Sequence, residues 1–321
     1  MKFIASIVIL KCAVLITVFP DNYAREARPV SRHASWGYVY HASKLSGEYL
    51  ARTIPRFDVI CVSGFTLDAA GRVRIARTGI INAVRTISAG QSKILYPMVT
   101  FQSAAAGRRI LGSARLSAAA AGSIANLVSR NGYAGVHLDF EYLPPEDAPL
   151  LARFLKMLRK SLKGKITMAV FPPVGFPEKW SGFHDLKLIA PLVDEIVIMC
   201  YDLHGVHTGP GPVTDTGWAE KNIEYALRLM KPDRIWLGIP AYGYRWCGAA
   251  IRTISSKQGA RMAKQYSSTR HRSGTLYLRW IDDGTRCEAY ISDKQTRLQL
   301  EKISSRHGLA GIALWRLGFD D

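Results

Sequence analysis

Three polar side chains alternate with apolar ones in one short, β-rich segment, residues 135–141, which reads GVHLDFE. Successive side chains of a strand point to opposite faces, so His137, Asp139 and Glu141 share one face. Carboxyl groups are costly to bury unless they are hydrogen-bonded or take part in a reaction. The pattern predicts a pair of catalytic acids, with a polar network that only stabilises the interior as the alternative.

Asp139 and Glu141 lie two residues apart on this face. Ionising both carboxyl groups at such close range is unfavourable, so we expect the pKa of one acid to rise and that of the other to stay low. Glu141 is nearer to the end of the strand and has the longer side chain, which suits a proton donor to a leaving group. Asp139 is expected to orient the substrate and stabilise charge.

The rest of the chain contains the elements that could position such a strand. Apolar runs bounded by Gly, Pro or polar turns recur along it, with helical stretches between them in which apolar residues are spaced by three and four. The eight strand candidates are residues 36–40, 57–65, 93–101, 133–141, 165–173, 193–202, 234–243 and 309–318. Strands that alternate with helices pair in parallel, and eight such units predict an α/β fold, the (β/α)8 TIM barrel, with its active site at the C-terminal ends of the strands.

The regular spacing is broken once, by residues 245–292, which hold a helix candidate and two short strand candidates. We expect an α+β insertion after strand seven, within a catalytic barrel that spans residues 36–321. Cys247 and Cys287 could form a disulfide across this insertion in an oxidising compartment, but sequence alone does not bring their Cα atoms within reach. Cys61 and Cys200 lie in apolar strand runs and are expected to be buried hydrophobic residues.

The segment GVHLDFE resembles the strand-four signature of glycoside hydrolase family 18, D-G-x-D-x-D-x-E, whose last acid is the catalytic proton donor. Three further segments resemble family strands in the same order: MCYD at residues 199–202, LGIPAYG at 237–243 and GIALWRLG at 311–318. The resemblance extends from residue 36 to residue 321. The stretch GYAGVHLDFEYLPPED is most similar to the bacterial branch that includes spore-germination and cortex-lytic N-acetylglucosaminidases.

The resemblance implies a retaining glycosidase that works by substrate-assisted catalysis on β-1,4-linked N-acetylglucosamine, in peptidoglycan or chitin. Glu141 would protonate the glycosidic oxygen, and the 2-acetamido carbonyl of the sugar would attack the anomeric carbon. Asp139 would hold the acetamido N–H, and Tyr201 would donate its hydroxyl to the acetamido oxygen. The sequence departs from the signature at Ala134 and His137, which leaves the tuning of Asp139 open. His137 is expected to be a hydrogen-bonded interior residue.

Three further residues are candidates for substrate binding. Trp315, on the last strand, would be the floor against which the sugar ring stacks, with a core aromatic as the alternative. Asp202 follows Tyr201 and could bind sugar hydroxyls or cap a loop. Tyr242, Tyr38 and Phe101 all lie near strand ends, where aromatic residues line a site or pack in the core, and Tyr242 is the candidate among them.

No metal site and no cofactor are expected. Two histidines, His204 and His207, follow strand six, but they lack partners at metal-ligand spacing. They are expected to be solvated loop residues.

The composition is that of a globular chain with a strong excess of positive charge. Among 321 residues, 48% are hydrophobic, and 43 Lys and Arg stand against 25 Asp and Glu, a net charge of +18. The cations are spread over many segments, which disfavours a nucleic-acid binder. We expect a monomer that binds an N-acetylglucosamine polymer and associates with an anionic cell-wall polymer. A catalytically silent, lectin-like barrel is the alternative function, against which the presence of both acids argues.

The N-terminal segment, residues 1–24, has the features of a leader: Lys2, an apolar stretch, and Ala24 before Arg25. Lys11 divides the apolar stretch, and a buried first strand is the alternative. We expect a signal peptide or membrane anchor, and hence a protein that is secreted or held in the periplasm or cell envelope.

Overall fold

Eight parallel strands form a closed barrel in the computed structural model, which describes residues 33–76 and 79–320. Neighbouring strands follow the order β1-β14-β8-β7-β6-β5-β4-β2, and pairing of β1 with β2 closes the ring. The barrel strands are β1 (Ala34–Val39), β2 (Val59–Leu67), β4 (Ile94–Phe101), β5 (Gly135–Leu138), β6 (Lys165–Val170), β7 (Glu195–Met199), β8 (Ile235–Pro240) and β14 (Gly311–Trp315). A short strand, β3 (Val73–Ile75), pairs antiparallel with β2. The predicted (β/α)8 TIM barrel is confirmed.

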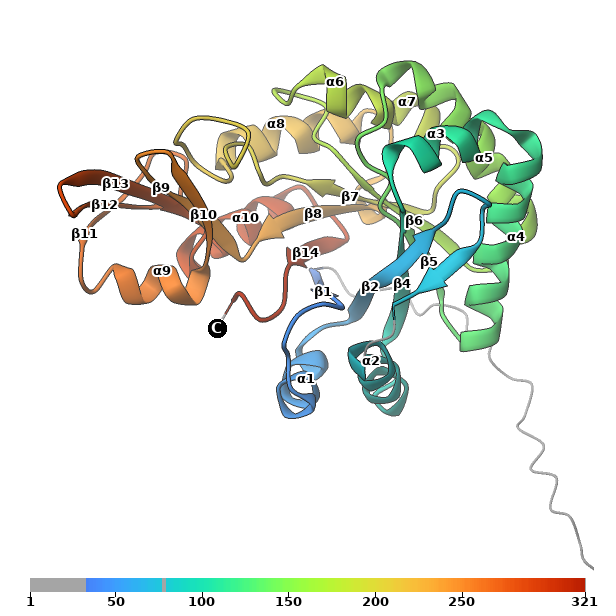
Figure 1. The fold of residues 1–321 in the computed structure, drawn as a ribbon, viewed down its shortest axis with the longest axis horizontal. Helices are drawn as coiled ribbons and strands as arrows, with labels where there is room; N and C mark the ends of the chain where they lie inside the picture. The colour runs from blue at the N-terminus through green and yellow to red at the C-terminus, as the bar shows by residue number, and fades with distance from the viewer. Residues whose placement is uncertain (1–32, 77–78, 321) are drawn as a thin grey trace, which may run out of the picture.

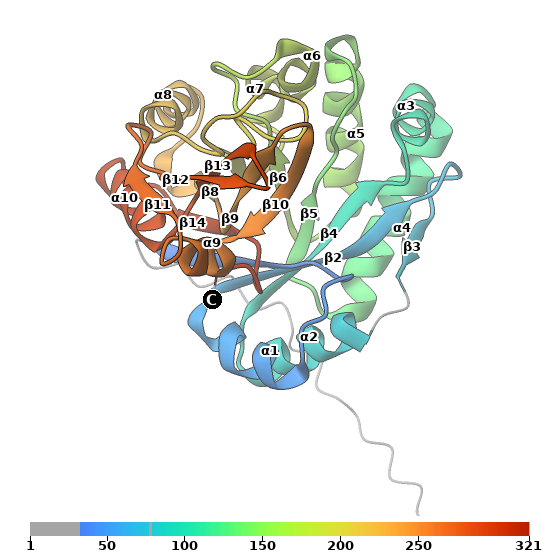
Figure 2. The ribbon, with the colours of Figure 1, turned by 60° about the vertical axis from the view of Figure 1, so that its left-hand side comes forward.

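Helices surround this barrel on its outside (Figures 1 and 2). They are α1 (Gly47–Thr53), α2 (Gly79–Gly90), α3 (Ala104–Gly112), α4 (Ala114–Asn131), α5 (Ala148–Ser161), α6 (Glu178–Ser181), α7 (Leu186–Ile189), α8 (Thr216–Leu227) and α10 (Lys294–Arg306). Helix α4 shows how local sequence sets the ends. The Ser113 hydroxyl caps the first turn by accepting the Leu116 N–H, and Gly132 closes the last turn at φ +66°.

The interior of the barrel is filled mainly by aromatic side chains. Trp36, Tyr96 and Trp236 are fully or almost fully buried there, and the Trp36 ring lies 5.3 Å from each of the other two. Cys61 belongs to the same interior cluster, and Cys200 to the outer core between strands and helices. Both thiols are buried, as the sequence predicts.

An antiparallel sheet of five strands is inserted between β8 and β14. Its order is β10-β9-β13-β12-β11, with β9 (Tyr242–Cys247), β10 (Ala250–Ser255), β11 (Ser267–Arg270), β12 (Leu276–Asp282) and β13 (Thr285–Ile291), and helix α9 (Ser256–Met262) packs on it. Figure 1 shows the sheet projecting from one side of the barrel, and Figure 2 brings it forward. The α+β insertion after strand seven is thus confirmed.

The insertion has more strands than the sequence predicts, and it begins earlier. Its first strand starts at Tyr242 rather than at residue 245, because the apolar run from residue 234 to 243 hides a change of direction at Ala241. Strand β11 is exposed along its whole length and carries no apolar pattern. Such a strand forms only through pairing with its neighbour β12.

Cys247 and Cys287 form a disulfide within this sheet. They are directly paired across β9 and β13, with their Cα atoms 4.3 Å apart. The register of β9 and β13 therefore brings the two cysteines within disulfide distance, which their spacing in the sequence alone did not show.

The N-terminal segment expected to be a leader, residues 1–24, lies outside the described residues. Over residues 33–76 and 79–320, the structure contains no helix with the length and apolar character that crossing a membrane requires.

Candidate active site

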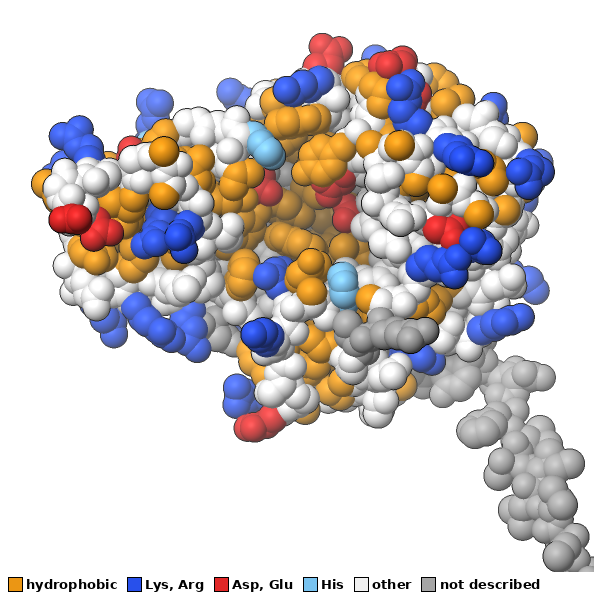
Figure 3. Space-filling view, in the orientation of Figure 1, with side chains coloured by type: hydrophobic (Ala, Val, Ile, Leu, Met, Phe, Trp, Pro, Cys, Tyr) orange, Lys and Arg blue, Asp and Glu red, His pale blue; other side chains and the backbone are white. Residues whose placement is uncertain are grey.

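A pocket of about 310 Å³ opens at the C-terminal ends of the barrel strands. Side chains from most of the strand ends and from the loops after β5, β6 and β7 line it, among them Tyr38, Asp139, Glu141, Tyr201, Asp202 and Trp315. In the space-filling view it is a hollow with mainly apolar walls and acidic side chains inside (Figure 3). Its volume lies at the lower end of the range of about 300 to 1,000 Å³ for small-molecule sites. The predicted acids, Tyr201, Asp202 and Trp315 thus meet in one cavity.

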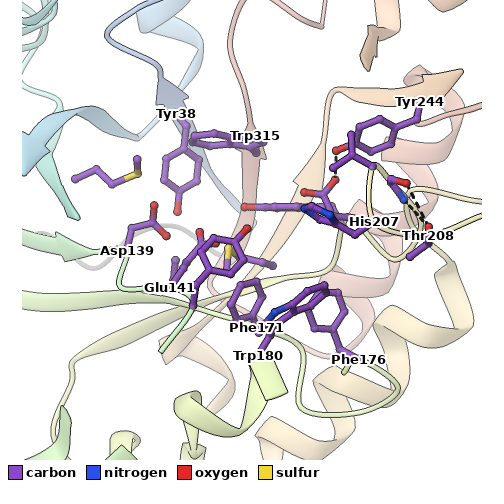
Figure 4. Close-up of a pocket in the computed structure, with 18 of the residues that line it drawn as sticks. Tyr38, Asp139, Glu141, Phe171, Phe176, Trp180, His207, Thr208, Tyr244 and Trp315 are labelled. Carbon is purple, nitrogen blue, oxygen red and sulfur yellow. Dashed lines mark hydrogen bonds between the residues drawn. The ribbon is translucent and has the colours of Figure 1, made fainter. Parts of the chain in front are cut away.

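Strand β5 positions the two acids as the alternating pattern predicts. Val136, Leu138 and Phe140 are fully buried in the outer core beneath the helices, whereas Asp139 and Glu141 face the pocket. The Asp139 N–H donates to the Val99 carbonyl at 3.0 Å, which extends the pairing with β4 to the first acid. Figure 4 shows both carboxyl groups pointing into the cavity.

The two carboxyl groups are hydrogen-bonded to each other, and this pairing changes their acidity. Burial raises the pKa of Glu141 well above its usual range, and the neighbouring Asp139 raises it further. Glu141 therefore keeps its proton in the range where a free glutamate is ionised. Burial also raises the pKa of Asp139, an effect that the hydrogen bond from Glu141 opposes. The expectation that the pKa of Asp139 stays low was wrong, because the enclosed pocket desolvates both acids.

His137 is a hydrogen-bonded interior residue, as expected. The Thr167 hydroxyl donates to the Val136 carbonyl at 3.1 Å, so its oxygen accepts a hydrogen bond from the Nδ1–H group of His137 at 2.9 Å. His137 Nε2 then accepts the Tyr38 hydroxyl at 3.0 Å. Burial lowers the pKa of His137 to about 3, so the ring is neutral and contributes no charge beside the acids.

The second departure from the family signature lies away from the acids. Ala134 directly precedes β5, at the N-terminal end of the strand, where its N–H and carbonyl pair with Leu95 and Lys165. Asp139 and Glu141 lie at the opposite end. The side chain at position 134 therefore has no place in the pocket.

Tyr201 and Asp202 line the same pocket as the acids. Burial raises the pKa of Tyr201 well above its usual value, so its hydroxyl remains a hydrogen-bond donor. One carboxylate oxygen of Asp202, Oδ1, accepts hydrogen bonds from the hydroxyls of Tyr242 at 2.6 Å and Tyr244 at 2.8 Å. Tyr242 lies behind Asp202 rather than in the pocket lining, where Tyr244 is found instead.

Trp315 forms the base of the cavity. Its ring packs edge-on against Tyr38 with centroids 5.4 Å apart, and it remains partly exposed to the pocket. Tyr38 also lines the pocket, whereas Phe101 stacks on Phe140 in the outer core at 3.9 Å. A flat aromatic surface in a pocket that also holds acids is a surface on which the apolar face of a ligand ring can lie.

An aromatic wall that the sequence patterns do not predict also lines the pocket. Tyr142 is 59% exposed at the mouth, and its ring lies 5.8 Å from Phe171 and 6.4 Å from Trp180. His207, expected only as a solvated loop residue, is exposed but lies over Trp180, 6.0 Å away. Aromatic residues just after strand ends, in loops rich in Gly and Pro, are the signal that could have identified this wall.

A second buried histidine, His184, holds the backbone around the acids. Its Nδ1 accepts the Phe171 N–H at 2.9 Å, so Nε2 carries the proton that it donates to the Phe140 carbonyl at 2.8 Å. Phe140 separates Asp139 from Glu141. Burial lowers the pKa of His184 to about 4. The neutral ring therefore ties the end of β5 to the end of β6.

The family model described as glycosyl hydrolases family 18 matches residues 108–320, which include every strand from β5 to β14. The chain belongs to glycosyl hydrolase family 18. The match includes the acids, Tyr201 and Trp315.

Individual relatives of this family 18 chain are distant. It is 26% identical over 204 residues to an uncharacterized glycosylase of Bacillus subtilis strain 168, covering 60% of this chain and 59% of the relative. It is 27% identical over 227 residues to the cortical fragment-lytic enzyme of the same organism, covering 66% of this chain and 53% of that enzyme. The chain thus spans little more than half the length of these two relatives.

Solved structures share the fold. A chitinase from Chromobacterium violaceum superposes with a TM-score of 0.82 at 21% identity, covering 90% of this chain and 95% of that one. The spore cortex-lytic enzyme of Bacillus cereus gives a TM-score of 0.79 at 20% identity, covering 89% and 71%.

Proposed function

We propose that this family 18 barrel is a retaining glycoside hydrolase that cleaves β-1,4-linked N-acetylglucosamine in peptidoglycan or chitin-type glycans. The observation that carries the proposal is the pair of mutually hydrogen-bonded acids, Asp139 and Glu141, in a pocket with an aromatic base. Desolvation keeps a proton on Glu141, which is the property that a general acid requires near neutral pH.

The reaction would proceed by substrate-assisted catalysis. Glu141 protonates the glycosidic oxygen, and the bond from that oxygen to the anomeric carbon breaks. The carbonyl oxygen of the 2-acetamido group attacks the anomeric carbon and gives an oxazolinium ion. Water, deprotonated by the Glu141 carboxylate, then adds to the anomeric carbon. This opens the oxazolinium ring and leaves the anomeric configuration retained overall. The substrate supplies the nucleophile at high effective concentration, so no second carboxylate needs to attack.

The remaining site residues would orient this nucleophile and bind the sugar. Asp139 accepts the acetamido N–H, and the Tyr201 hydroxyl donates to the acetamido oxygen as charge develops on the ring. Trp315 stacks against the pyranose. Asp202, held by two tyrosine hydroxyls on Oδ1, has its other oxygen available for sugar hydroxyls. Tyr242 would act through Asp202.

The location that we propose is outside the cytoplasm, in the periplasm or cell envelope or as a secreted protein. A disulfide between Cys247 and Cys287 supports an oxidising compartment. In that setting the net charge of +18 would favour association with an anionic cell-wall polymer.

The test is the Glu141→Gln variant, assayed with a chromogenic N-acetylglucosamine oligomer. Gln keeps the shape of the side chain but cannot donate a proton to the leaving group. We expect kcat to fall by a factor of roughly 10³ or more, with sugar affinity retained. A protein that shows no turnover in either form but binds the oligomer would be the lectin-like alternative.

The products distinguish the bond that is cleaved. On purified peptidoglycan and on chitin oligomers, we expect new reducing ends of N-acetylglucosamine, read by mass and reducing-end type. Muramic acid at every new reducing end would show that the assigned linkage is wrong.

A further inference from the structure

Arg316, the residue after the pocket base Trp315, is a partly buried cation that has no acidic partner among the described residues. Its guanidinium carbon lies 4.0 Å from the centroid of the Phe319 ring and 4.9 Å from that of Tyr40. Its Nη1 donates to the Ser43 hydroxyl. Among residues 33–76 and 79–320, no carboxylate lies within ion-pair distance of it, although such pairs occur at many other arginines.

An arginine in this state is unusual because a guanidinium offers five N–H donors and no acceptor. The Ser43 hydroxyl is the one hydrogen-bond acceptor that the described residues supply to it. Partial burial of an unpaired charge is unfavourable, yet two aromatic rings and a hydroxyl fix its position. A fixed guanidinium with unused N–H groups has the geometry that binds a carboxylate through two parallel hydrogen bonds.

The surroundings of Arg316 place it on the rim where the pocket opens. Ser43 and Tyr40 follow β1, and Phe319 follows β14, the strand paired with β1. The Phe319 ring lies 6.3 Å from that of Tyr242, which bonds the pocket residue Asp202. Arg316 therefore lies at the end of the barrel where the pocket opens, close to the pocket but outside its lining.

We propose that Arg316 binds a carboxylate carried by the sugar adjacent to the one in the pocket, which makes peptidoglycan the substrate. This inference rests on the proposed function. The sugars of chitin carry no charge. In peptidoglycan, every second sugar is a muramic acid, whose lactyl ether ends in a carboxyl group, free or extended by an acidic peptide. A fixed cation beside the site is suited to that substituent and has no counterpart in chitin.

The test measures binding separately from turnover, with the Glu141→Gln protein and with Glu141→Gln combined with Arg316→Gln or Arg316→Lys. The ligands are an N-acetylglucosamine–muramic acid tetrasaccharide with free lactyl carboxylates, its methyl ester, and the chitin tetrasaccharide, titrated by calorimetry. We expect the free acid to bind about tenfold more tightly than the ester when Arg316 is present. Arg316→Gln should abolish this difference and leave affinity for the chitin tetrasaccharide unchanged, and Arg316→Lys should retain part of the difference.

An exposed arginine on the insertion, Arg252, supplies the matched control, because Arg252→Gln removes the same charge from strand β10. This variant should preserve the preference for the free acid. If Arg316→Gln weakens binding of all three ligands equally, or leaves the preference intact, Arg316 is only a packing residue and the proposal is overturned. Binding of chitin without any preference for the acid would also overturn it while leaving the proposed function in place. Failure to bind any of the three glycans would reject both.

Discussion

His184 shows how a residue that never reaches the pocket can control the acids inside it. It bonds the carbonyl of Phe140, between Asp139 and Glu141, and the N–H of Phe171, whose ring lines the pocket. Both bonds require the same neutral tautomer, and burial, which lowers the pKa of His184 to about 4, maintains it. A shift of about 1 Å in the position of a catalytic acid can reduce the rate of the reaction by a factor of about 100.

Two amide variants separate the two bonds of His184. In His184→Gln the terminal amide can reach the position of Nε2 and donate to the Phe140 carbonyl, whereas in His184→Asn it can reach that of Nδ1 and accept the Phe171 N–H. We expect kcat to fall roughly 10-fold in His184→Gln and about 100-fold in His184→Asn, with KM little changed. Steady-state kinetics on an N-acetylglucosamine oligomer provides the measurement.

A control distinguishes positioning from general destabilisation. Leu158→Ala, in the buried face of α5, should lower the melting temperature as much as the His184 variants and leave kcat unchanged. Equal kcat in the two His184 variants would contradict the positioning role. In addition, the wild-type protein should lose stability as the pH falls from about 6.5 towards 4, because the unfolded imidazole gains a proton that buried His184 does not accept. Both variants should weaken this pH dependence.

At the level of elements, strand β9 joins the insertion to the active site. The strand begins with Tyr242 and also contains Tyr244, and the hydroxyls of both residues donate to Asp202. Its last residue, Cys247, is bonded to β13 by the disulfide. The insertion therefore supports the pocket wall, and its stability should affect the site.

Replacing both cysteines tests this link. In Cys247→Ser with Cys287→Ser, the unfolded chain loses a cross-link between residues 40 apart, and we expect a loss of about 3 to 4 kcal/mol in stability. Loosening of β9 should also raise KM several-fold. Thermal unfolding and kinetics with and without a reducing agent provide the measurements. The double variant should not respond to the reductant, and a wild-type protein that does not respond either would contradict the prediction.

The whole molecule carries its positive charge in an arrangement that a net count does not reveal. Figure 3 shows cations scattered around the face that bears the pocket. Three cations on or just after α9, however, lie close together. Lys257, Arg261 and Lys264 are exposed at spacings of four and three residues, and no ion pair joins them to described residues. With Lys294 and Arg297 on α10 they border a groove of about 350 Å³, whose lining also includes Asp293 and Asp320. Like charges at this spacing repel one another, so a polyanion bound there would be stabilising.

We therefore expect the α9 face to contribute most to association with an anionic wall polymer. Replacing Lys257, Arg261 and Lys264 by Gln should weaken sedimentation with walls that carry phosphate polymers by roughly tenfold at low salt, and added salt should weaken the wild type similarly. The matched control removes three exposed cations of α4 and α5, Arg130, Lys156 and Lys160. An equal loss in the control would mean that only net charge matters.

The sequence by itself determined the barrel, the inward face of β5 and the grouping of the acids with Tyr201, Asp202 and Trp315. The barrel and the inward face of β5 follow from local periodicity, because alternation along a strand and the parallel arrangement of eight βα units fix which side chains face the C-terminal mouth. The grouping of the acids with Tyr201, Asp202 and Trp315 follows from the resemblance of their segments to strands of the family.

Only the tertiary structure decided what depends on contacts between distant segments. The disulfide follows from the register of β9 and β13, and the position of Tyr242 behind Asp202 follows from the turn at Ala241. The loops after β1 and β14 leave Arg316 without an acidic partner among the described residues. The raised pKa of Asp139 likewise reflects enclosure by residues far away in the chain. Register, enclosure and pairing are properties of neighbours in space, and a linear pattern does not contain them.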